Sequence, residues 1–255
     1  MSDNHLDFID DVIQFLENER EIYGDFTVAG FSPGDKNDTS VSDSQEKIKT
    51  ESPSADTKNY NPENLLKQCS TLEELRSLCE TADVLRTDLD GTNLVFGVGN
   101  QNADLMLIGE APGEQEDRQG EPFVGAAGQL LNKILEAVKF RREDVYIANI
   151  LKHRPPGNRN PNPEERQRSL PYLLRQIELI QPKLILCLGK ISGITLLNRD
   201  TTLRSLRGKY YPFHGAELTV TYHPAALLRH PKWKRPVWED VQKLREKYDE
   251  LGGKP

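Results

Sequence analysis

Residues 104–109 read DLMLIG, a short apolar run bounded by turn residues, and three similar runs follow it along the chain. They are VYIANI at 145–150, KLILCLG at 183–189 and ELTVTYHP at 217–224. Helix-length stretches separate the runs: 128–140, 163–180 and 190–198. Strands that alternate with helices need crossover connections, which favour parallel pairing with helices on both faces. The sequence therefore predicts an α/β fold, a three-layer αβα sandwich around a mainly parallel four-stranded sheet.

Polar residues and glycines follow each predicted strand, where an open parallel sheet binds its ligands. The first run leads into the tight turn 109–113, which presents Glu110, and Asn149 ends the second run. Gly189 ends the third, and His223 ends the fourth. A carboxylate, an amide and an imidazole at one sheet edge predict an active site there.

The chain divides by composition into three segments, 1–23, 24–61 and 62–255. The first has apolar residues at near-helical spacing and is expected to form an amphipathic helix. This helix is either a docking element for a protein partner or simply a frayed amphipathic segment. The second is rich in Ser, Asp, Lys and Pro, which predicts a flexible acidic linker. The third is the folded domain; in it, Glu74 follows Thr71 by three residues, as in a helix capping box.

Charge is distributed unevenly along the chain, whose net charge is -7. Residues 1–94 contain 21 acidic and 8 basic side chains, whereas residues 95–255 contain 19 acidic and 25 basic ones. A basic domain behind an acidic leader fits a nucleic-acid partner for the second part only. No apolar run is long enough for a membrane span, and the acidic start differs from a signal peptide, so we expect a cytoplasmic protein with no membrane contact.

Four longer motifs resemble those of family 4 uracil-DNA glycosylases. They are GEAPGEQEDRQGEPFVGAAGQLL at 109–131, NILKHRPPGNRNP at 149–161, LRGKYY at 206–211 and HPAALLRHPKWKRPVWEDVQKL at 223–244. The resemblance covers about residues 62–251 and includes TNLVFGVGN at 92–100. It implies a monomeric DNA repair enzyme that flips uracil out of single- or double-stranded DNA and hydrolyses its glycosidic bond, leaving an abasic site.

The resemblance also implies a role for individual residues. Glu110 would position the attacking water and stabilise the cationic sugar, while His223 would donate to uracil O2 as negative charge develops there. Phe123 would stack on the uracil, and Asn149 would pair with its N3–H and O4 groups. Gly109 and Ala111 would line the same pocket; the second is often glycine in the family. DNA contacts would come from Pro224, Leu227 as the wedge entering the minor groove, Arg229, Arg154 and Arg207.

The sequence departs from the family at the four cysteines that hold an iron–sulfur cluster. Aligned through the neighbouring motifs, those positions are Ala82, Leu85, His153 and Ser169. We therefore predict no cluster, no other metal and no cofactor. A rebuilt site from Cys69, Cys79 and His153 is the alternative; otherwise Cys69, Cys79 and Cys187 are reduced thiols.

Two other functions stay open at this point. The chain is either an active glycosylase for uracil or a catalytically weak DNA-binding descendant whose acidic leader recruits a partner. A third reading is a glycosylase for another deaminated base, such as hypoxanthine or xanthine. Retention of Glu110, Phe123, Asn149 and His223 favours the first, because a mere binding protein need not keep all four.

Overall fold

The computed structural model describes residues 62–253, so the predicted segments 1–23 and 24–61 lie outside the described residues. Its centre is a six-stranded sheet with the order β1-β3-β2-β4-β6-β5. The strands are β1 (Val98–Gly99), β2 (Leu105–Gly109), β3 (Tyr146–Asn149), β4 (Leu184–Leu188), β5 (Tyr211–Phe213) and β6 (Ala216–Thr221).

The four inner strands are the four predicted from the apolar runs, and all three pairings among them are parallel. The prediction of a parallel core is confirmed, but the sheet is larger than four strands. At its edges β1 pairs with β3, and β5 pairs with β6, both antiparallel. These edge strands have two and three residues, too few for an alternating pattern to be visible in the sequence.

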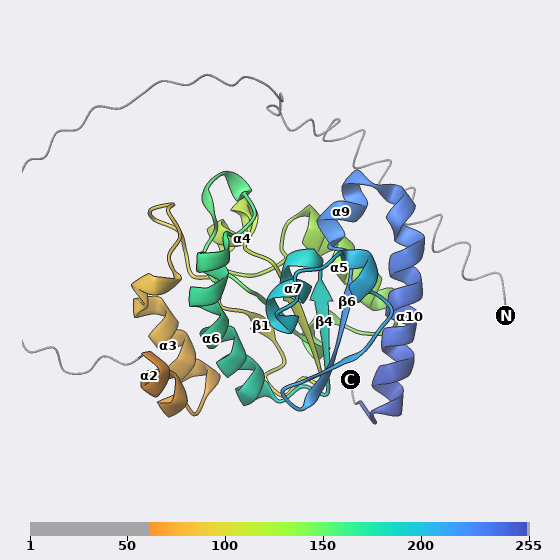
Figure 1. The fold of residues 1–255 in the computed structure, drawn as a ribbon, viewed down its shortest axis with the longest axis horizontal. Helices are drawn as coiled ribbons and strands as arrows, with labels where there is room; N and C mark the ends of the chain where they lie inside the picture. The colour runs from red at the N-terminus through yellow and green to blue at the C-terminus, as the bar shows by residue number, and fades with distance from the viewer. Residues whose placement is uncertain (1–61, 254–255) are drawn as a thin grey trace, which may run out of the picture. The chain divides into compact units, whose positions relative to one another are not determined.

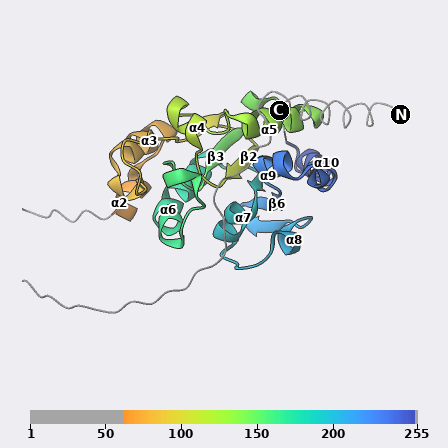
Figure 2. The ribbon, with the colours of Figure 1, turned by 90° about the horizontal axis from the view of Figure 1, so that it is seen from above.

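Helices cover both faces of the sheet (Figures 1 and 2). Met106, Ile108, Ile185 and Cys187 point to one face and pack into a core with residues of α3, α6 and α7. Leu186 and Leu188 point to the other face, which α5 and α10 cover. The helices are α2 (Pro62–Gln68), α3 (Leu72–Thr81), α4 (Glu114–Gln119), α5 (Ala126–Ala137), α6 (Pro163–Ile180), α7 (Lys190–Leu197), α8 (Leu203–Leu206), α9 (Pro224–Arg229) and α10 (Lys234–Glu250).

Helix α3 begins with the predicted capping box. The Glu74 backbone N–H donates to Thr71 Oγ1 at 3.2 Å, and the Thr71 backbone N–H donates to Glu74 Oε2 at 3.3 Å. Two otherwise unpaired backbone donors are thereby satisfied at the helix start. Leu72, Leu75 and Cys79 then form the buried stripe of α3, which packs against α6. No helix in the described part of the chain is both long and apolar enough to cross a membrane.

We expect Leu75→Ala to lower the free energy of unfolding by about 2–5 kcal/mol, because it leaves a cavity under a fully buried side chain. Denaturant unfolding measures the change. Arg76→Ala on the exposed side of the same helix is the matched control and is expected to stay within about 0.5 kcal/mol of wild type. Equal effects of the two substitutions would contradict the docking of α3 on the core.

Candidate active site at the carboxyl edge of the sheet

The predicted site residues lie at the carboxyl ends of the inner strands. In Figure 1 this is the edge of the sheet toward which the β4 arrow points. Gly109 at the end of β2 lies in register with Asn149 at the end of β3. Two backbone bonds continue this pairing: Ile150 N–H to the Gly109 carbonyl and Leu151 N–H to the Glu110 carbonyl, both at 3.1 Å. The strand pairing therefore fixes Glu110 beside the end of β3.

The side chains of Asn149 and Phe123 pack directly against the backbone of Gly109. A Cβ atom there would overlap Asn149 Oδ1 and would lie 2.6 Å from Cζ of Phe123. Only a residue without a side chain fits, since real Cβ atoms do not approach other atoms so closely. Gly109 thus brings the amide and the aromatic ring to one place.

Phe123 has a left-handed backbone, with φ of 53°, which a non-glycine residue keeps only when its surroundings hold it there. Glu116 provides one restraint by accepting from Val124 N–H at 3.0 Å and Gly125 N–H at 2.9 Å. Arg142 provides another through its 2.6 Å bond to the Pro122 carbonyl. The ring is buried, and its centroid lies 5.4 Å from that of His223, with the planes at 29°.

Asn149 is 2% exposed, and its side-chain oxygen has no hydrogen-bond partner. Among the buried side-chain nitrogen and oxygen atoms of residues 62–253, it is the one atom left unsatisfied. A buried polar atom without a partner costs about 1–3 kcal/mol. The site therefore holds an acceptor that a bound molecule with an N–H group would satisfy.

His223 caps the start of α9, because its Nδ1 accepts from the Ala225 N–H at 3.2 Å. Burial lowers the pKa of His223 to about 4, and the positive charge of Arg229 acts in the same direction. The imidazole is therefore neutral near pH 7. With Nδ1 accepting, the ring proton is on Nε2, which leaves that nitrogen as a donor.

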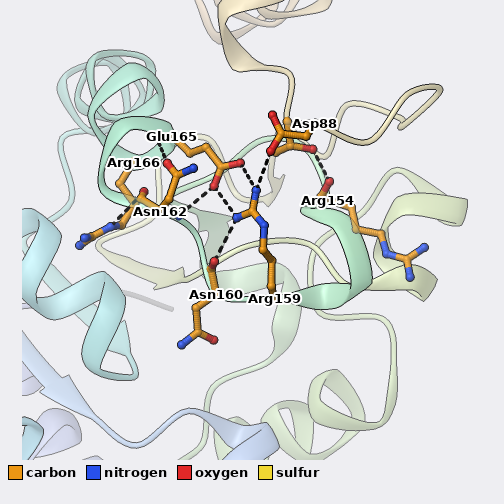
Figure 3. Close-up of polar contacts among 8 residues, drawn as sticks. Asp88, Arg154, Arg159, Asn160, Asn162, Glu165 and Arg166 are labelled. Carbon is orange, nitrogen blue, oxygen red and sulfur yellow. Dashed lines mark hydrogen bonds and ion pairs between the residues drawn. The ribbon is translucent and has the colours of Figure 1, made fainter. Parts of the chain in front are cut away.

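Burial raises the pKa of Glu110, while the charges of Arg166 and Arg229 oppose the rise. Sequence reasoning missed Arg166, because its place in an amphipathic helix is typical of a solvated cation. Arg166 donates to Thr195 Oγ1 at 3.1 Å. It also donates to the Asn162 carbonyl at 3.4 Å (Figure 3). Two cations from different elements thus favour the ionised carboxylate against burial.

Lys152, also missed, is fully buried behind Asn149. Its Nζ donates to the carbonyls of Asn149 at 3.0 Å and Phe96 at 3.3 Å, and to Gln176 Oε1 at 2.5 Å. Three acceptors use all three donors of an ammonium group, although burial lowers the pKa of Lys152 to about 7. Lys152 thereby fixes the backbone of Asn149; a lysine in a loop gives no sign of burial in the sequence.

The residues predicted to contact DNA differ in their exposure in this structure, and their contact with DNA stays a prediction. Pro224 and Leu227 are buried residues of α9, which packs against α5. Arg207 binds Asp240 at 2.8 Å and the Pro236 carbonyl at 2.7 Å, so its side chain is tied to α10. Arg154, 18% exposed, donates to Asn158 Oδ1 at 2.7 Å. Arg229 is exposed, and its charge acts on both Glu110 and His223.

Comparison with known protein families gives a match that covers this edge of the sheet. The family model of the uracil DNA glycosylase superfamily matches residues 96–244, which include all of the site residues above. The chain belongs to the uracil-DNA glycosylase superfamily.

Curated relatives in this superfamily include three proteins named type-4 uracil-DNA glycosylase. The one from Archaeoglobus fulgidus is 44% identical, over 66% of this chain and 87% of the relative. The one from Pyrobaculum aerophilum is 42% identical, over 67% and 91%. The one from Thermotoga maritima is 41% identical, over 62% and 84%.

The four positions aligned with the cluster cysteines do not fit an iron–sulfur cluster. Ala82 and Leu85 are buried in the apolar core. Ser169 donates to the Ile150 carbonyl at 2.7 Å, and His153 Nδ1 lies 3.0 Å from Thr92 Oγ1. Within residues 62–253, no three His, Cys, Asp or Glu side chains are grouped to hold a metal, so the alternative site from Cys69, Cys79 and His153 is not formed.

Polar contacts tie the segment before β1 to the loop after β3, as Figure 3 shows. Arg159 binds both carboxylate oxygens of Glu165, at 2.7 and 2.8 Å, and reaches Asp88 Oδ2 at 3.1 Å. Thr87 Oγ1 donates to the Arg154 carbonyl at 2.6 Å. These bonds connect the two segments that the cluster cysteines come from in the resembling family.

The depressed pKa of His223 makes a testable prediction. With a pKa of about 4, about 1% of this imidazole is protonated at pH 6, and its proton is on Nε2. Nitrogen-detected NMR of the histidine rings across pH 4–8 checks this, with His223→Gln assigning the signal. The unfolded chain binds this proton at higher pH than the folded chain, so stability falls as pH drops from about 6.5 toward 4. Titration of the folded-state signal near 6.5 would contradict the prediction.

Proposed function

We propose that this chain removes uracil from DNA by hydrolysing the N-glycosidic bond, which leaves an abasic site for base excision repair. The observation that carries the proposal is the unpartnered acceptor Asn149 Oδ1, buried against Gly109 and the ring of Phe123. Relatives at 41–44% identity that are named uracil-DNA glycosylases support it.

The amide of Asn149 suits the edge of uracil. Uracil N3–H would donate to Oδ1, and the amide N–H₂ would donate to O4, whereas cytosine presents an acceptor at N3 and a donor at C4. When the wrong base leaves the buried acceptor unpaired, the kcat/KM for that base is lower by a large factor. Thymine has the same edge as uracil, so its exclusion depends on the space around the C5 methyl group. Phe123 provides the flat surface on which the base stacks.

Charge separation during cleavage suits the two polar side chains on either side of the base. As the bond between C1′ and N1 breaks, its electron pair leaves with uracil, and the sugar becomes cationic. Neutral His223 would donate a hydrogen bond from Nε2 to uracil O2, where negative charge gathers. The Glu110 carboxylate would stabilise the cation and orient the water whose oxygen bonds to C1′. One O–H bond of that water breaks, and its proton neutralises the uracil anion, so the products are free uracil and a C1′ hydroxyl. Uracil must leave the base stack to reach this edge, at a cost of a few kcal/mol.

The direct test is release of free uracil from a uracil-containing oligonucleotide. We expect wild type to leave abasic sites, and Glu110→Gln to be about 10²–10⁴-fold slower. Glu121→Gln, an exposed carboxylate from the same loop, is the control and should match wild type. Activity should persist with a chelator, as the prediction of no metal requires.

The other outcomes decide between the remaining functions. Wild type that binds the oligonucleotide but releases nothing would replace the proposal with a DNA-binding descendant. Release of hypoxanthine or xanthine in place of uracil would replace the substrate. Equal rates for Glu110→Gln and wild type would remove Glu110 from the mechanism.

A further inference from the structure

Four planar side chains contact one another in a column that includes Tyr222, the residue before His223. The guanidinium carbon of Arg207 lies 4.6 Å from the ring centroid of Tyr222. Tyr222 stacks on Trp233, with ring centroids 4.8 Å apart and planes at 17°. His230 follows, with its centroid 4.5 Å from that of Trp233 and a tilt of 53°. The superfamily function described above uses none of these three contacts.

The Arg207 end of the column is anchored inside the protein. Arg207 binds Asp240 and the Pro236 carbonyl, and Asp240 Oδ2 also accepts from Thr221 Oγ1 at 2.5 Å. Thr221 ends β6, so the anchor joins the central sheet to α10. The rings are thus held in place before any ligand binds.

The other end of the column reaches the surface. His230 is exposed, and Trp233 is half-buried. Tyr222 is next to His223 in the chain, and α9 connects His223 to His230, so the open end belongs to the same edge of the sheet as the active site (Figure 1). Three exposed cations neighbour His230 and Trp233 in the chain: Arg229, Lys232 and Arg235.

We propose that the exposed end of this column, His230 and Trp233, binds an unpaired base of single-stranded DNA that flanks the uracil. The inference rests on the proposed function, because the flanking base is defined by a uracil in the active site. An exposed aromatic pair with cations next to it in the chain fits an unstacked base with its phosphates. Duplex DNA fits less well, since its bases are already stacked on each other. Stacking of one base on an aromatic side chain changes affinity by about 5- to 150-fold.

Tryptophan fluorescence tests the contact without any catalysis. The chain has two tryptophans, so Trp238→Phe leaves Trp233 as the reporter. We expect a thymidine decamer without uracil to quench this emission, and a duplex of the same length to quench it less. No quenching by the single strand at concentrations that bind would overturn the proposal, whether or not the protein releases uracil.

Affinity measured by fluorescence anisotropy gives a second test in the wild-type background. Trp233→Ala should weaken single-strand binding by about 5-fold or more, and Trp233→Phe, which keeps a ring, should restore most of it. His214→Ala is the matched control: His214 is also exposed and adjoins an aromatic ring, Phe213, but lies in the turn between β5 and β6, at the opposite edge of the sheet. It should leave binding unchanged.

A substrate series separates a base-binding role from a merely structural one. Oligonucleotides with an abasic analogue on the 5′ or the 3′ side of uracil lack the proposed partner of the column. On one of the two sides, the abasic analogue should weaken binding to wild type by the same factor as Trp233→Ala weakens binding to the intact oligonucleotide. Combining that analogue with Trp233→Ala should weaken binding no further than either change alone. Single-turnover cleavage at saturating DNA should stay near the wild-type rate. The proposal would be overturned if the analogue and Trp233→Ala weakened binding additively on both sides of uracil. It would also be overturned if Trp233→Ala slowed cleavage at saturating DNA without changing affinity.

Discussion

The close approach at Gly109 is the constraint on which the site depends. A parallel register between β2 and β3 brings Gly109 opposite Asn149, and the missing side chain leaves room for both the amide and the Phe123 ring. Other groups hold these two partners from behind. Lys152 binds the backbone carbonyl of Asn149, and Glu116 holds the strained turn that presents Phe123. Buried hydrogen bonds next to the pocket therefore keep it rigid. They use backbone groups, so the side-chain amide of Asn149 stays available to a ligand.

The pKa values of the two acid–base groups of the site, Glu110 and His223, shift in opposite directions. Burial raises the pKa of Glu110 and lowers that of His223, because it penalises the charged form of each. Arg166 and Arg229 counter the effect at Glu110, and Arg229 reinforces it at His223. The result is a carboxylate supported by two cations and a neutral imidazole with a fixed tautomer. That pair suits a reaction in which positive charge forms on one side of a bond and negative charge on the other.

The inner sheet and the meeting of Gly109, Asn149 and His223 at its carboxyl edge could be predicted from the sequence because both depend on local pattern. Apolar runs mark the buried strands, and residues at their ends must meet at one edge. What could not be predicted depends on distant partners. Arg207 is withdrawn from solvent by Asp240, 33 residues away, and Leu227 is buried by α5, nearly a hundred residues earlier in the chain. Lys152 could not be found either, since its three acceptors come from three separate segments.

A crystal structure of Glu110→Gln bound to a uracil-containing oligonucleotide tests the central claim most directly, because the substitution slows cleavage and keeps the pocket. We predict uracil stacked on Phe123, with N3 about 2.9 Å from Asn149 Oδ1 and O2 within hydrogen-bond distance of His223 Nε2. A base bound elsewhere, or an Asn149 oxygen still without a partner in the complex, would contradict the account.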